Sequence, residues 1–195
     1  MRTLPLLVLS ALAAACAFRM KTDEMGPAAT GELREQVKGD EILRQYSLGR
    51  EGKADVFKYF KKAVDPADKN KTIEVLKRKE LDLNGDGRID LWVSYDDAGA
   101  VVEQKMDLDF DGKVDVIDHF EKNVVVRKEV FHTFTEKPDE WKFYEKGKLA
   151  RVERALHHPK ADYWEYWEGD HIDRIGEDSD GDGQVDKWTR VKKDE

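Results

Sequence analysis

Three short acidic segments have a residue spacing that could hold metal ions. They cover residues 82–90, 107–115 and 178–186, and each reads D-x-[DN]-x-D-G-x-[IV]-D. In such a loop, side-chain oxygens at positions one, three and five can converge on one hard cation, glycine at position six permits a sharp turn, and the carbonyl at position seven adds a ligand. The aspartate at position nine can ligate directly or through water. The sequence therefore predicts three cation sites of similar construction.

The predicted ligands occupy equivalent positions in the three loops, and position seven contributes only its main-chain carbonyl. In chain order they are Asp82, Asn84, Asp86, Arg88 and Asp90, then Asp107, Asp109, Asp111, Lys113 and Asp115, then Asp178, Asp180, Asp182, Gln184 and Asp186. Asp118, at position twelve of the second loop, is a further candidate ligand. Without a cation, the carboxylates of each loop repel one another, and the sequence shows no other compensation. An all-oxygen ligand set favours Ca²⁺, because Mg²⁺ demands a stricter octahedron.

The loop pattern resembles the calcium loops of EF-hands, dockerins, thrombospondin type 3 repeats and integrin-like FG-GAP repeats, and residues 82–91 are especially close to the last of these. The resemblance implies up to three Ca²⁺ ions. An EF-hand has glutamate at position twelve and a helix on each side, whereas position twelve here is Val93, Asp118 or Thr189 and the flanks read as strands. We therefore expect calcium to act as a structural staple and not as an EF-hand switch. The alternative is that the loops are acidic turns that only solvate the edge of a sheet.

An aspartate recurs at a nearly constant interval and organises the rest of the chain. After an earlier copy at Asp55, its copies are 25, 24, 23 and 24 residues apart, at Asp90, Asp115, Asp139, Asp162 and Asp186. An aromatic or apolar residue follows two and five positions after each copy, and every tryptophan falls into one of these two slots. Such self-similarity indicates a repeat architecture.

Apolar and polar residues alternate with a period of two inside each unit, which is typical of β-strands. Turn residues at 96–99, 122–123 and 146–147 are followed by expected return strands at 101–106, 124–131 and 149–156. The predicted fold is all-β, a meander of about six β-hairpin repeats with a period near 24 and acidic calcium loops between them. The sequence leaves open whether the sheet stays open, closes into a barrel or stacks on itself. Helix is expected only for a turn or two near residues 31–37.

Rings in the slot two residues after the repeated aspartate form a ladder along one face of the predicted sheet. They are Phe57, Trp92, Trp141, Trp164 and Trp188. An exposed ladder could stack on sugar rings, which suits a glycan- or cell-wall-binding protein, whereas a buried ladder is the packed face of a repeat sheet. Charged residues on the return strands, such as Glu103 and Lys105, are expected to form cross-strand ion pairs on a solvated face.

The N-terminus has the features of a secretory signal. Arg2 supplies the positive start, and the apolar residues 4–15 are too few to span a bilayer as a helix. Small residues lead directly into Cys16, the only cysteine of the chain. This order resembles a bacterial lipoprotein signal, although Ala13 stands where that family usually has leucine. The resemblance implies cleavage before Cys16, acylation of this cysteine and anchoring to the lipid bilayer.

The lipoprotein resemblance divides the chain into a signal peptide (1–15), a lipidated flexible tether (16–31) and a β-hairpin repeat domain (32–195). Ala17 replaces the aspartate that retains such lipoproteins at the inner membrane. The resemblance therefore implies the outer membrane, with the domain facing the periplasm or the cell surface.

The 195-residue chain has 42 acidic and 34 basic residues, for a net charge of −8. Nucleic-acid binding is not expected, because phosphate contacts require an excess of Lys and Arg. No serine lies in a nucleophile-elbow pattern, and abundant carboxylates do not identify an acid–base pair, so no enzymatic activity is expected. The sequence predicts a calcium-stabilised outer-membrane lipoprotein that acts as a binding or structural module with a protein or glycan partner. The alternative is glycan or cell-wall binding through the ladder, and a hydrolase is the third choice.

Overall fold

The computed structural model describes residues 31–49, 52–132 and 137–192. The predicted signal peptide, Cys16 and nearly all of the predicted tether lie outside these ranges. The described residues form strands, turns and loops, without a helix. The strands are β1 (Gly31–Lys38), β2 (Glu41–Ser47), β3 (Val56–Val64), β4 (Thr72–Leu81), β5 (Leu91–Tyr95), β6 (Val101–Met106), β7 (Val116–Glu121), β8 (Val124–Val130), β9 (Glu140–Glu145), β10 (Lys148–Arg154), β11 (Tyr163–Glu168), β12 (His171–Glu177) and β13 (Lys187–Arg190).

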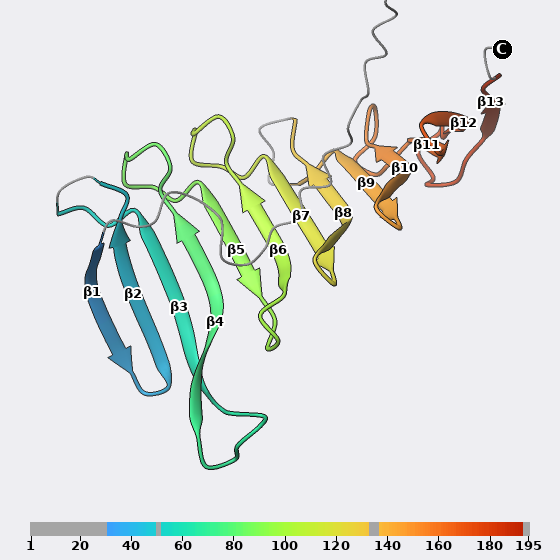
Figure 1. The fold of residues 1–195 in the computed structure, drawn as a ribbon. Helices are drawn as coiled ribbons and strands as arrows, with labels where there is room; N and C mark the ends of the chain where they lie inside the picture. Colours follow the sequence, from blue (N-terminus) through green and yellow to red (C-terminus); the bar gives the residue numbers. More distant parts are fainter. Residues whose placement is uncertain (1–30, 50–51, 133–136, 193–195) are drawn as a thin grey trace, which may run out of the picture.

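All 13 strands belong to one antiparallel sheet, in which every strand pairs with the strands next to it in sequence (Figure 1). The sheet stays open, with β1 at one end and β13 at the other. Within the described ranges, the backbone of each strand lies beside that of its sequence neighbours only, and no second layer packs on either face. The predicted all-β meander is therefore confirmed, and its form is an open sheet.

Six hairpins follow one another from β1–β2 to β11–β12, and β13 stands after the last acidic loop as a single strand. The hairpin turns lie at one end of the strands and the loops that join successive hairpins at the other (Figure 1). The three acidic loops connect β4 to β5, β6 to β7 and β12 to β13. The meander thus lines these loops up along one side of the sheet.

The first hairpin corrects a sequence prediction. Residues 31–37, where a helical turn is expected, form strand β1, which pairs with β2 over its whole length. Leu33 and Val37 have helical spacing, but both side chains are exposed, so no neighbouring surface holds them in a helix. Backbone hydrogen bonds to β2 determine the structure here.

Tight turns close the hairpins where the sequence predicts them. In the β7–β8 turn, Lys122 and Asn123 both have positive φ, 51° and 63°, as in the type I′ turn that matches the twist of the strands. The β3–β4 hairpin ends instead in a longer turn over residues 65–71, which accounts for the larger interval of 35 residues between Asp55 and Asp90. A register shift recurs beyond the middle of the hairpins, as between Ser94 and Tyr95, and such bulges increase the twist.

The two faces of the sheet differ in character. One face buries an apolar cluster made by β3 to β6, consisting of Val56, Leu81, Leu91, Val93 and Val101. The other face carries the ring ladder in a single row, because cross-strand pairing places Trp92 between Glu80 and Lys105. The rings thus alternate with residues of the return strands, except on β7, where Ile117 takes the place of a ring.

The charged residues for which cross-strand pairs are expected pair along their own strand, which corrects the sequence prediction for them. Lys105 Nζ lies 3.2 Å from Glu103, and Arg151 Nε lies 3.0 Å from Glu153. Residues i and i+2 share a face of a strand, so long side chains reach each other along it. The same spacing pairs Arg78 with Glu80 and Arg127 with Glu129. Other return-strand residues do pair across strands, as Lys128 with Asp118 and Arg154 with Glu140.

Candidate metal centre

The repeated aspartate closes the loops between hairpins. In the loop of residues 82–90, Asp90 Oδ2 accepts the backbone N–H groups of Leu83 and Asn84, at 2.6 and 3.2 Å. Charge-assisted bonds of this kind are strong and hold the loop closed. Equivalent bonds from loop residues six or seven positions earlier reach Asp55, Asp115, Asp139, Asp162 and Asp186. This role explains why the aspartate persists in loops that lack the ligand spacing.

Side chains at positions three and five fold each acidic loop locally. In the second loop, Asp109 Oδ1 accepts the N–H of Asp111 at 3.1 Å, and Asp111 Oδ1 accepts the N–H of Lys113 at 2.8 Å. The other two acidic loops contain the same pair of bonds. Such side-chain-to-backbone turns fix the loop conformation without long-range contacts.

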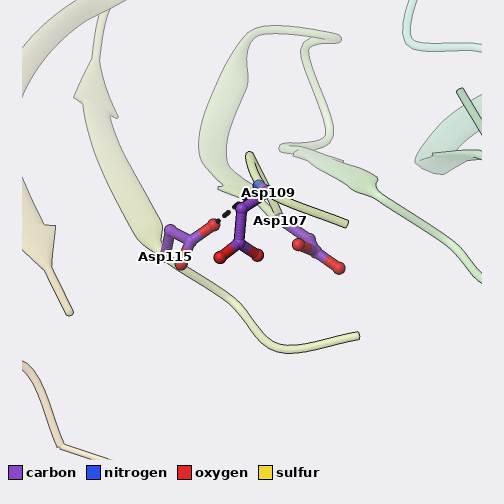
Figure 2. Close-up of side chains that lie close together, drawn as sticks. All are labelled: Asp107, Asp109 and Asp115. Atoms are coloured by element: carbon purple, nitrogen blue, oxygen red, sulfur yellow. Dashed lines mark hydrogen bonds between the residues drawn. The ribbon is translucent and has the colours of Figure 1, made fainter. Parts of the chain in front are cut away.

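Carboxylates converge in two of the three predicted sites. In the Asp107 cluster (Asp107, Asp109 and Asp115) and in the Asp178 cluster (Asp178, Asp180 and Asp186), one oxygen from each residue lies within 4.8 Å of the other two. Figure 2 shows the first of these, with a hydrogen bond from the backbone of Asp109 to the carboxylate of Asp115. These two acidic clusters could hold a metal ion.

Asp107 has an oxygen that no protein group uses. The residue is only 2% exposed, and its Oδ2 accepts the N–H of Gly112 at 2.8 Å. Its Oδ1 is buried and has no hydrogen-bond partner among the described residues. An unsatisfied buried polar group costs roughly 1–3 kcal/mol. A cation in the cluster would supply the missing interaction.

The backbone beside Asp107 is strained. Position four of the acidic loops has a left-handed backbone, which Gly85 (φ 84°) and Gly181 (φ 78°) adopt without steric cost, but the second loop places Phe110 there with φ 64°. This conformation costs a residue with a side chain about 1 kcal/mol. The N–H groups of both glycines donate to the aspartate at position one, a bond that Asp107 Oδ1 lacks.

Asp178 uses both of its oxygens. They accept the N–H groups of Gly181 at 2.7 Å and Gly183 at 2.8 Å. Burial alone would raise the pKa of Asp178, but the hydrogen bonds from the loop backbone outweigh burial and lower this pKa below its usual value. The carboxylate is therefore ionised at neutral pH, as a cation ligand must be.

The loop of residues 82–90 differs, because a lysine from the preceding loop reaches it. Lys53 Nζ donates to the carbonyl of Gly85 and lies 3.4 Å from Asp82 Oδ2. Asn84 also replaces a carboxylate at position three. The expectation that the loop carboxylates lack any compensating charge is therefore wrong for this loop.

Several other predicted ligands have partners outside the clusters. Asp118 lies on β7 and is not part of the Asp107 cluster, since Lys128 Nζ lies 3.0 Å from its Oδ1. At position five, Asp86 lies 3.4 Å from Arg88 Nε, Asp111 lies 3.5 Å from Lys113 Nζ, and Asp182 accepts a bond from Gln184 Nε2 at 3.0 Å.

The ring ladder is intermediate in exposure. Its four inner rings are half-buried, and Trp188, on the end strand β13, is 51% exposed. The ring of Tyr166 lies 5.7 Å from that of Trp188, and the guanidinium of Arg174 lies over both rings, at 4.5 and 5.1 Å. Half-buried rings between ion pairs favour packing over sugar stacking for the inner part of the row.

Among the described residues, there is no helix of the length and apolarity that crossing a membrane requires.

Among solved structures, the chain resembles the crystal structure of accessory secretory protein 1,2 and 3 in Streptococcus pneumoniae, with 14% identity and a TM-score of 0.35, over 63% of this chain and 18% of that one. It also resembles the GtfA/B complex, with 16% identity and a TM-score of 0.26, over 74% of this chain and 21% of that one. The chain thus spans about a fifth of the length of these proteins, and likeness at these scores indicates nothing about function. No family model matches the chain, and no curated protein matches it.

Proposed function

We propose that this protein is a calcium-stabilised β-sheet, attached to the outer membrane through acylated Cys16, that acts as a binding or structural module. The observation that carries the calcium part is the buried Oδ1 of Asp107, which lacks a hydrogen-bond partner among the described residues and lies in a cluster of carboxylates. A bound cation satisfies this oxygen and removes the repulsion between the carboxylates.

The chemistry of the two clusters supports calcium. All their side-chain ligands are oxygens, which hard cations prefer. Ca²⁺–oxygen distances are about 2.3–2.6 Å, so ligands on opposite sides of the ion lie about 5 Å apart. In both clusters the three oxygens lie within 4.8 Å of one another, so one ion can reach all three. Among the described residues, the carboxylates of the two clusters form no ion pair with Lys, Arg or His. The ion pairs near the acidic loops involve Asp82, Asp86, Asp111 and Asp118, which lie outside the clusters.

Equilibrium dialysis against calcium tests this part of the proposal. The wild-type chain should bind two ions, and Asp107→Asn should bind one, because the substitution removes a charged ligand at similar volume. Asp96→Asn is the control: Asp96 accepts backbone N–H groups in the β5–β6 turn, away from the clusters, and its loss should leave two ions bound. A wild-type chain that binds no calcium contradicts the proposal.

Membrane fractionation tests the anchor. In a bacterium that processes lipoproteins, the wild-type chain should sediment with membranes, because two or more acyl chains give stable anchoring where one is marginal. Cys16→Ser should move it to the soluble fraction. Equal membrane association of both forms would show that Cys16 is not the anchor.

A further inference from the structure

We propose that Lys53 is the built-in cation of the loop of residues 82–90, so that this loop takes a protein ammonium group in place of calcium. The proposal deepens the calcium function and rests on it for the number of ions bound. Lys53 Nζ donates to the Gly85 carbonyl and lies 3.4 Å from Asp82 Oδ2. The Asp82 side chain is only 2% exposed, whereas that of Lys53 is 41% exposed, so the ammonium group closes the loop from its solvent side.

The contacts of Lys53 are those that a loop cation makes. It contacts one carboxylate oxygen and one main-chain carbonyl of the same loop, and it lies close to the turn glycine at position six, since a Cβ on Gly87 would be 3.9 Å from Nζ. A divalent ion in this loop would have to share it with the ammonium charge. Two positive unit charges about 4 Å apart repel by about 4 kcal/mol at a dielectric constant near 20, and the double charge of a divalent ion makes this about 8 kcal/mol.

The loop also has the weakest set of its own ligands. Asn84 leaves it three aspartates, where each of the other two acidic loops has four. One of these three, Asp86, already has Arg88 at 3.4 Å. The ammonium group of Lys53 therefore meets a smaller negative charge than calcium would meet in either cluster.

Lys53 belongs to a sequence pattern that explains its position. A basic residue stands two positions before the repeated aspartate in five successive units, as Lys53, Arg88, Lys113, Lys137 and Lys160. Because neighbouring loops lie side by side along the sheet, a residue at this position can reach the next loop, and the first two of the five do so. Lys53 reaches the loop of residues 82–90, and Arg88 reaches the loop of residues 107–115.

Arg88 shows why the outcome differs in the next loop. Its Nη1 donates to the main-chain carbonyl of Asp111 at 3.2 Å and would lie 2.8 Å from a Cβ on Gly112. It makes no ion pair with Asp107, Asp109 or Asp115, whose carboxylates stay available to a metal ion. The basic residue at this sequence position thus places a positive charge beside a carboxylate in the loop of residues 82–90, but not in the loop of residues 107–115.

Calcium dialysis and thermal unfolding of Lys53→Gln test the proposal. Wild type should bind two ions and Lys53→Gln three, because the variant removes the positive charge beside Asp82 and the Gly85 carbonyl. In EDTA, Lys53→Gln should melt a few degrees below wild type, because the attraction between the Lys53 ammonium group and Asp82 is lost, and calcium should remove this difference. Lys160→Gln is the matched control, since Lys160 holds the equivalent position without an ion pair among the described residues; it should bind two ions and melt like wild type in EDTA.

The outcomes separate the two proposals. Three ions on wild type, or two on Lys53→Gln, would overturn the role of Lys53 while leaving calcium binding intact. If neither chain binds calcium, the proposed function fails, and the melting temperatures in EDTA then decide the role of Lys53. A lower value for Lys53→Gln than for Lys160→Gln supports that role, and equal values overturn it.

Discussion

Calcium in about 100-fold excess over its dissociation constant is expected to raise the free energy of unfolding by about 5 kcal/mol, because each of two independent sites adds ~2.7 kcal/mol. Position twelve offers no bidentate glutamate, so the dissociation constants should be on the order of 10⁻⁴ to 10⁻³ M, as in extracellular calcium modules. The gain is comparable to the whole stability of a marginal domain, about 5–15 kcal/mol. The measurement is thermal and denaturant unfolding of the unacylated Cys16→Ser chain, first in EDTA and then in calcium.

Substitutions rank the loops in the same experiment. Asp109→Ala should remove more of the calcium gain than Asn84→Ala, since Asp109 belongs to the Asp107 cluster and Asn84 lies in the loop that Lys53 reaches. Equal unfolding transitions in EDTA and calcium would refute calcium stabilisation. Equal gains from magnesium and calcium would make the clusters generic cation sites.

Replacing Arg154 with leucine is expected to lower the free energy of unfolding by about 3–5 kcal/mol, the usual cost of leaving a buried charge without its partner. Arg154 Nε lies 2.6 Å from Glu140 and its Nη1 lies 2.6 Å from Glu165, and the two glutamate side chains are 7% and 8% exposed. Without the guanidinium, two buried carboxylates, on β9 and β11 at either side of β10, lose the cation that they share, and Glu140 keeps only Lys142 at 2.9 Å. Urea unfolding at pH 7 measures the loss.

The pH dependence identifies the cause of that loss. Burial raises the pKa of Glu140, but hydrogen bonds and charges from Lys142 and Arg154 outweigh it and lower this pKa. A depressed folded-state pKa gives stability that is present above the unfolded value, about 4.3, and is lost as the pH falls through the folded value. The difference in the free energy of unfolding between wild type and Arg154→Leu should therefore shrink below pH 4.

Arg151→Leu is the control. It breaks a more exposed pair with Glu153 and should cost about 1 kcal/mol or less. A loss of only about 1 kcal/mol for Arg154→Leu would refute the stabilising role of its ion pairs with Glu140 and Glu165.

The hairpins could be predicted from the sequence because the same alternation and turn residues recur with each copy of the aspartate. β1 lies outside this pattern. The spacing of Leu33 and Val37 favours a helix, and the hydrogen bonds from β2 that make it a strand come from the fold. The pairing of Glu103 with Lys105 was likewise hidden, because strand alternation puts both on one face without telling which neighbour each contacts.

In the candidate site, the ligand positions could be predicted from the spacing of residues within each loop. The basic residues that balance the charge of a loop could not, because they come from other parts of the chain. The loop conformation is built from bonds between residues two to seven positions apart, as in the bond from Asp111 to Asp109. Lys53 is 32 residues away from Gly85, and only the sheet brings the two loops together. Asp118 has the right offset in sequence, but Lys128 on the next strand pairs with it.

Because each strand pairs only with its sequence neighbours, the sheet behaves as a row of linked interfaces and not as a single core. Each hairpin lengthens the row by about 9.5 Å, the width of two strands. The gain or loss of a hairpin together with its loop changes only the pairing at that point of the row and the side-chain contacts to the adjacent units, such as that of Lys53 with Gly85. β1 and β13, which have one neighbour each, detach before the inner strands, so the sheet opens from its two ends toward the middle.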